Sequence, residues 1–91
     1  MHNALMMLSA KINAASGGAY KARFNNQYGQ IEICAPITPF RSIGLIHATF
    51  PFLRFSMPHF PTKASQIRDV LLGAGYTEDE PGSVRFQCPT E

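Results

Sequence analysis

The chain has 91 residues, of which 45% are apolar and 15% are charged. This length suffices for one modest core, so we expect a single globular domain over residues 1–91 and exclude a catalytic domain joined to a separate binding domain. No apolar run is long enough to cross a membrane, and residues 1–8 lack the basic and apolar regions of a signal peptide. We therefore expect a cytoplasmic protein.

Positive charge is concentrated in the first part of the chain. Residues 1–76 hold seven of the eight lysines and arginines but only two acidic residues, whereas residues 77–91 hold one arginine and four acidic residues. A basic body can attract nucleic acid or an acidic protein. The isoelectric point near 8.7 is below the value typical of nucleic-acid-binding domains, so an ordinary solvated surface is the simpler interpretation.

An amphipathic helix is predicted over residues 3–15. Leu5, Leu8 and Ile12 recur at spacings of three and four residues, which places them on one stripe of the helix. The sequence Ser-Gly-Gly at 16–18 ends the helix, because glycine adopts the left-handed conformation at little cost.

A β-hairpin is predicted from residues 19–25 and 30–35. Apolar and polar residues alternate in both segments, which is the period of a half-buried strand. Tyr20 and Phe24 fall on the apolar side of the first segment. The residues between the two segments have the composition of a turn.

Residues 42–50 are predicted to form either a strand buried on much of both faces or a short helix. Their β-branched and aromatic residues favour the strand. As a strand, one face would carry four side chains: Ile43, Leu45, His47 and Thr49. Residues 52–57 can extend it as a further short strand.

A second helix is predicted over residues 62–74, with Thr62 as its N-cap and Gly75 at its end. Ile67 and Leu71 lie on its apolar stripe. A short strand at 76–78, a Pro-Gly turn at 81–82 and a strand at 84–88 complete the chain.

The predicted order is α-β-β-(β)-α-β. It indicates an α+β fold in which two helices pack on one face of a mainly antiparallel sheet of four or five strands. The predicted core comprises Leu5, Leu8, Ile12, Phe24, Ile31, Ile33, Ile67, Leu71, Val84 and Phe86.

The order α-β-β-β-α resembles that of the double-stranded-RNA-binding domain. In that family the second helix begins with several lysines, whereas residues 62–66 contain one, and here a strand follows the helix. The resemblance is one of element order alone and implies no function.

No catalytic or metal-binding motif is present, so we predict no enzyme activity, no cofactor and no metal site. The glycines at 17–18 lack the lysine and the spacing of a phosphate-binding loop. Four residues have side chains of the type that binds zinc: Cys34, His47, His59 and Cys88. Their separations of thirteen, twelve and twenty-nine residues do not match the close ligand pairs of structural zinc sites. The two cysteines are expected to be reduced thiols.

Residues 36–61 form the most unusual segment, with five of the seven prolines and five of the seven phenylalanines. A small domain has little interior, so we expect some of these rings at the surface, where aromatic, Met and Arg side chains form binding hot spots. The alternative is that the rings form the core and the prolines shape the loops. The predicted partner surface comprises Phe50, Phe52, Arg54, Phe55, Met57 and Phe60.

These features favour a non-enzymatic protein-binding module that occludes or bridges a larger protein or complex. The same hypothesis includes a homodimer formed through this segment. Small accessory proteins of phages and mobile elements fit this description, including inhibitors of bacterial defence systems such as anti-CRISPR proteins. The alternative is a small nucleic-acid-binding module with a basic strand face. Its predicted surface comprises Tyr20, Lys21, Arg23, Tyr28 and Arg41.

Overall fold

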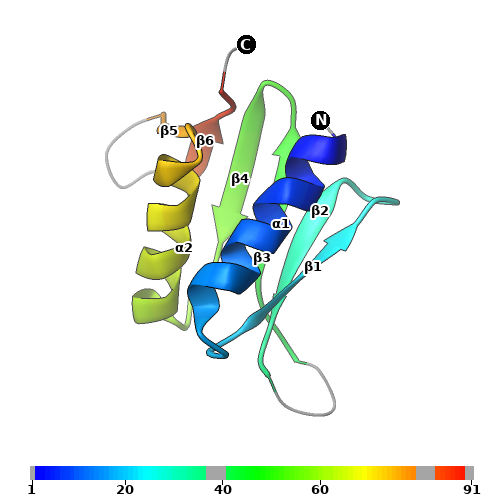
Figure 1. Cartoon of the computed structure of the whole chain (residues 1–91). Coiled ribbons are helices and arrows are strands. Elements are labelled where there is room, and N and C mark those ends of the chain that lie inside the picture. Colours follow the sequence, from blue (N-terminus) through cyan, green and yellow to red (C-terminus); the bar gives the residue numbers. More distant parts are fainter. Residues whose placement is uncertain (1, 37–40, 80–83, 90–91) are drawn as a thin grey trace.

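The computed structural model describes residues 2–36, 41–79 and 84–89. In chain order it contains helix α1 (His2–Ser16), strands β1 (Lys21–Asn25), β2 (Gln30–Cys34), β3 (Ser42–Thr49) and β4 (Phe52–Ser56), helix α2 (Pro61–Gly73), and strands β5 (Thr77–Glu78) and β6 (Arg85–Gln87). Both helices lie on the same face of the sheet (Figure 1). The predicted α+β class is confirmed, with six strands in place of four or five.

The strands form one antiparallel sheet in the order β1-β2-β3-β4-β6-β5. The predicted hairpin is β1 and β2, and residues 42–50 form a strand rather than a helix. Strands β3 and β4 form a second hairpin, joined by Phe50 and Pro51 through a cis peptide bond. The predicted turn at 81–82 lies outside the described residues.

An irregularity in the pairing of β2 with β3 changes which side chains of β3 are buried. Ile33 pairs with Gly44 but its neighbour Cys34 pairs with Ser42, so Ile43 is an extra residue on β3. Such a bulge breaks the two-residue alternation. As a result, Ile43 and Ile46 are both buried although they lie three residues apart. The prediction that Ile43 shares a face with His47 is therefore wrong.

Helix α1 follows its predicted pattern. Leu5, Leu8 and Ile12 are at most 2% exposed and face the sheet. Gly17 and Gly18 follow the helix with φ angles of 59° and 89°, values that side-chain-bearing residues rarely adopt.

Helix α2 starts one residue earlier than predicted. Its N-cap is Phe60, whose carbonyl accepts a hydrogen bond from the Ala64 amide at 2.8 Å, and Pro61 occupies the first helical position. The prediction of Thr62 as N-cap is wrong, because proline has the helical φ angle and no amide to satisfy at that position. Neither described helix has the length and hydropathy that a membrane crossing requires.

The core lies between the two helices and the sheet. Eight of the ten predicted core residues are buried there: Leu5, Leu8, Ile12, Ile31, Ile33, Ile67, Leu71 and Phe86. Phe24 is only partly buried against this cluster. Val84 is 54% exposed, which corrects its prediction as core. The physical reason is that β6 is short and starts at Arg85. Val84 lies just before it at the margin of the sheet, where its carbonyl accepts a hydrogen bond from the Phe55 amide at 2.8 Å but its side chain is left uncovered.

Helix α1 is tied to the edge strand β1 by one side chain. Asn13 donates a hydrogen bond from Nδ2 to the Ala22 carbonyl at 2.9 Å, and its Oδ1 accepts one from the Ala22 amide at 2.8 Å. These two bonds occupy backbone groups on the side of β1 that pairs with no strand. An otherwise open sheet edge is thereby covered at this residue.

Candidate functional site

The predicted partner surface between Phe50 and Phe60 does not form one exposed patch. Phe55 and Met57 are each 7% exposed and belong to the core, so their prediction as partner-binding residues is wrong. The reason is the alternation along β4, in which every second side chain faces the helices. Phe52 and Phe60 are partly buried, and Arg54 is exposed on the opposite face of the sheet. Phe50, at the turn between β3 and β4, is 72% exposed.

The predicted nucleic-acid surface is also divided. Tyr20 is 2% exposed and lies on the helix side, so its prediction as a contact residue is wrong. Side chains alternate between the two faces along β1, so Lys21 and Arg23 are exposed on the other face of the sheet. Tyr28 is exposed in the turn of the first hairpin, and Arg41 is exposed just before β3.

The four side chains weighed as zinc ligands occupy different parts of the fold. Cys34 is buried in β2, His47 is exposed on β3, His59 is exposed after β4, and Cys88 follows β6. Within residues 2–36, 41–79 and 84–89, no three His, Cys, Asp or Glu side chains gather as a metal site.

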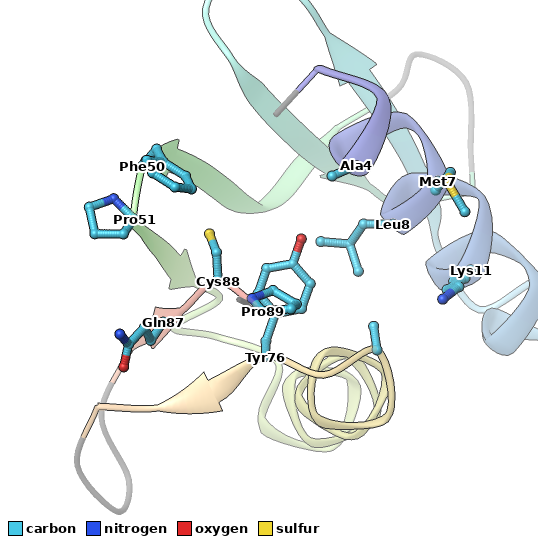
Figure 2. A pocket seen from close by; sticks show the side chains of 11 residues that line it. Ala4, Met7, Leu8, Lys11, Phe50, Pro51, Tyr76, Gln87, Cys88 and Pro89 are labelled. Atoms are coloured by element: carbon cyan, nitrogen blue, oxygen red, sulfur yellow. The ribbon is translucent and has the colours of Figure 1, made fainter. Parts of the chain in front are cut away.

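A pocket of about 630 Å³ lies where α1, the β3–β4 turn, the end of α2 and the end of β6 meet (Figure 2). Its volume is in the range of small-ligand and side-chain binding sites. It is lined by Ala4, Met7, Leu8 and Lys11 of α1, Phe50 and Pro51 of the turn, Ala74 and Tyr76 after α2, and Gln87, Cys88 and Pro89 at the end of β6.

Two large apolar side chains of this pocket are exposed to solvent. Phe50 is 72% exposed and Met7 is 62% exposed, and both line the pocket. In Figure 2 the Tyr76 ring stands between Leu8 and Cys88. Among the described residues that line the pocket, Lys11 is the one with a charged side chain, and none is acidic. These residues therefore present an apolar surface with one positive side chain.

The β3–β4 turn is held in place at the pocket. The Cys88 amide donates a hydrogen bond to the Pro51 carbonyl at 2.9 Å, which joins the turn to the end of β6. Phe50 is therefore displayed from a backbone that is fixed on both sides, by the β3–β4 pairing and by this bond.

The polar groups of the pocket fit binding better than catalysis. Burial raises the pKa of the Cys88 thiol, and burial together with the nearby Cys88 raises the pKa of the Tyr76 phenol. Both groups are therefore protonated at neutral pH. A protonated thiol is a weak nucleophile, so Cys88 and Tyr76 offer hydrogen-bond donors rather than a nucleophile or a base.

Sequence analysis identifies Phe50 but misses Met7, Lys11, Tyr76 and Cys88. Of these residues, Met7 could have been predicted as exposed, since it is a large apolar residue of the first helix that lies off the buried Leu5–Leu8 stripe. The other residues come from segments that are distant in sequence, so no spacing rule connects them.

A scan against protein-family models, a search of curated proteins and a search of solved structures each find no match to this chain.

Proposed function

We propose that this chain is a protein-binding module that docks an apolar segment of a partner protein in the pocket at Met7 and Phe50. The observation that carries this proposal is the exposure of these two side chains, 62% and 72%, at an apolar pocket of about 630 Å³. Large apolar side chains are normally buried, and their exposure beside a hollow is typical of a contact surface.

The binding surface is already ordered before a partner docks. The Cys88–Pro51 hydrogen bond fixes the turn that carries Phe50, and Met7 stands on a helix whose opposite stripe is packed in the core. A surface that is already ordered loses little conformational entropy when a partner docks. Met7 adds adaptability, because its unbranched thioether can adjust to the shape of the partner.

Lys11 indicates that the partner segment carries an acidic side chain. Among the described residues that line the pocket, Lys11 is the one with a charged side chain, and a carboxylate on the partner would complement its ammonium group. We therefore expect the docked segment to combine a large apolar side chain with a neighbouring aspartate or glutamate.

Selection from a random peptide library displayed on phage tests the proposal with a defined probe. We expect the enriched peptides to share a large apolar residue next to an acidic one. Their affinity for the wild-type protein is then compared with that for Phe50→Ala, which we expect to weaken binding by about thirtyfold, equivalent to about 2 kcal/mol.

Two neighbouring methionines provide a matched control. Met6 and Met7 are adjacent on α1 and similarly exposed, at 52% and 62%, but only Met7 lines the pocket. Met7→Ala should weaken the enriched peptides about tenfold, and Met6→Ala should leave their affinity within about twofold. Equal effects of the two substitutions, or enriched peptides that bind Phe50→Ala like wild type, contradict the proposal.

The wider role stays a prediction from the sequence. A non-enzymatic accessory protein that occludes or bridges a larger complex is compatible with a docking pocket of this kind. An inhibitor of a bacterial defence system is one member of that class.

A further inference from the structure

The face of the sheet that points away from both helices carries a continuous series of polar side chains. Cross-strand pairing joins Asn25 to Gln30, Gln30 to His47, His47 to Arg54, and Arg54 to Arg85. We call this face the open face and these five residues the polar row. Directly paired residues point to the same side of a sheet, so the row crosses five neighbouring strands on the open face.

Two like charges meet in the polar row, because Arg54 and Arg85 stand directly opposite each other on β4 and β6. His47 is opposite Arg54 on β3 and offers a ring N–H as a hydrogen-bond donor. Like charges at paired positions repel each other, and an anionic ligand placed between them would relieve this repulsion. Adjacent strands are about 4.8 Å apart, so one phosphate group can contact two of these side chains at once.

The two arginines differ in their surroundings. The Arg85 guanidinium is oriented by Asp79, with Nε donating to Oδ2 at 3.0 Å, and it lies 4.4 Å from the centroid of the Phe52 ring. Arg54 is exposed and has no hydrogen bond or ion pair with the residues that the structure describes. One cation is thus fixed in place, and the next can turn toward a ligand.

The rest of the open face is mixed. Lys21 and Arg23 extend the positive charge to β1, and Leu45 and Phe52 add two apolar side chains. Among the described residues, Glu32 and Asp79 are the acidic ones on or beside this face. The opposite side of the sheet is apolar and covered by α1 and α2 (Figure 1). The open face is therefore mainly polar and net positive, as in nucleic-acid interfaces rather than in apolar protein interfaces.

We propose that the open face binds single-stranded nucleic acid, with phosphates at His47, Arg54 and Arg85. This site is separate from the apolar pocket and does not depend on the proposed protein-binding function. A broad, uncovered sheet accommodates an unpaired strand, whose bases can lie flat on it. The amide side chains of Asn25 and Gln30 can donate to and accept from base edges.

Fluorescence anisotropy with a labelled thymidine oligonucleotide of about fifteen nucleotides tests the proposal. This length is near the upper end of known single-strand site sizes, roughly 4–16 nucleotides. We expect binding that weakens with salt, with log K falling against log salt concentration at a slope of about −0.7 for each phosphate contact. Arg54→Gln should weaken binding roughly fivefold or more and make the slope less steep by about one contact.

Two variants separate the site from general charge and from folding. Lys63→Gln removes one positive charge from α2, on the other side of the molecule, and should change affinity less than twofold. Arg54→Lys keeps the charge and should retain most of the affinity. Thermal unfolding of each variant shows whether it is folded.

Three outcomes overturn the proposal. The first is the absence of oligonucleotide binding at about 50 mM salt, where phosphate contacts are strong. The second is an equal loss of affinity in Lys63→Gln and Arg54→Gln, which would indicate attraction by net charge alone. The third is full competition by poly-glutamate of similar length, which would make the open face a site for acidic protein.

Discussion

Replacing Asn13 with alanine is expected to destabilise the protein even though it improves the helix. Asn13 makes two hydrogen bonds with the backbone of Ala22, at 2.9 and 2.8 Å, in a partly buried position. Each such bond contributes about 0.5–1.5 kcal/mol net, so their loss costs about 1–3 kcal/mol. The gain in helix propensity from Asn to Ala offsets at most about 0.7 kcal/mol. We expect a net loss near the middle of the resulting range, about 1–2 kcal/mol.

Thermal and urea unfolding followed by circular dichroism measure this effect. For a domain of this size, about 1–2 kcal/mol corresponds to a fall in Tm of roughly 5–15 °C. Gln66→Ala is the control, since Gln66 is an exposed amide on α2 without a hydrogen bond to any described residue. Its change should stay within about 0.5 kcal/mol. If Asn13→Ala is as stable as wild type, the helix-to-edge-strand bonds do not stabilise the fold.

Three further predictions concern single buried groups. The Tyr20 hydroxyl is buried without a hydrogen-bond partner among the described residues, so Tyr20→Phe should keep or raise Tm, and a fall of more than about 4 °C would count against this. At Gly44 an added Cβ would lie 3.0 Å from the Ser56 carbonyl oxygen and from Met57 Cγ, so Gly44→Ala should cost about 1–3 kcal/mol in urea unfolding, and an unchanged midpoint would contradict the packing. Burial raises the pKa of both thiols and so lowers their thiolate fraction, and iodoacetamide at about pH 8 should therefore alkylate the folded chain more slowly than the unfolded chain. Cys34, which is 2% exposed, should react more slowly than Cys88, and equal rates in the folded and unfolded chains would refute the burial of the thiols.

The elements of this fold were predictable because their signals are local. The stripe of Leu5, Leu8 and Ile12 specifies one helix face without reference to the rest of the chain. The alternation around Ile31 and Ile33 specifies the hairpin in the same way, because a strand with one buried face has a period of two. The α+β class follows from the order of these elements.

The side chains that face solvent were less predictable, because exposure depends on what covers each face. Phe50, Phe52 and Phe55 are similar in sequence context, yet one is exposed, one is partly buried and one is core. The exposure of each ring depends on the turn at Pro51 and on the position of the helices. The bulge at Ile43 adds a residue that the alternating pattern cannot anticipate.

The pocket could not be predicted from the sequence. Met7, Phe50, Tyr76 and Cys88 come together only when α1, the β3–β4 turn and the end of β6 meet. The aromatic content of its segment predicts Phe50 as a surface residue, and its apolar neighbours predict Arg54. The structure separates these two residues onto different sites, and this separation changes the expected phenotype of each substitution.

Methionine methyl NMR tests the proposed docking site most directly. The chain has four methionines, of which Met7 lines the pocket, Met6 is exposed outside it and Met57 is 7% exposed in the core. Protein labelled with ¹³C at the methionine methyl groups is titrated with a peptide enriched from the library. We expect the Met7 methyl signal to shift until the peptide saturates the site, while the Met6 and Met57 signals stay in place. A titration in which Met7 is unmoved at saturating peptide, or in which Met6 moves as much as Met7, would contradict it.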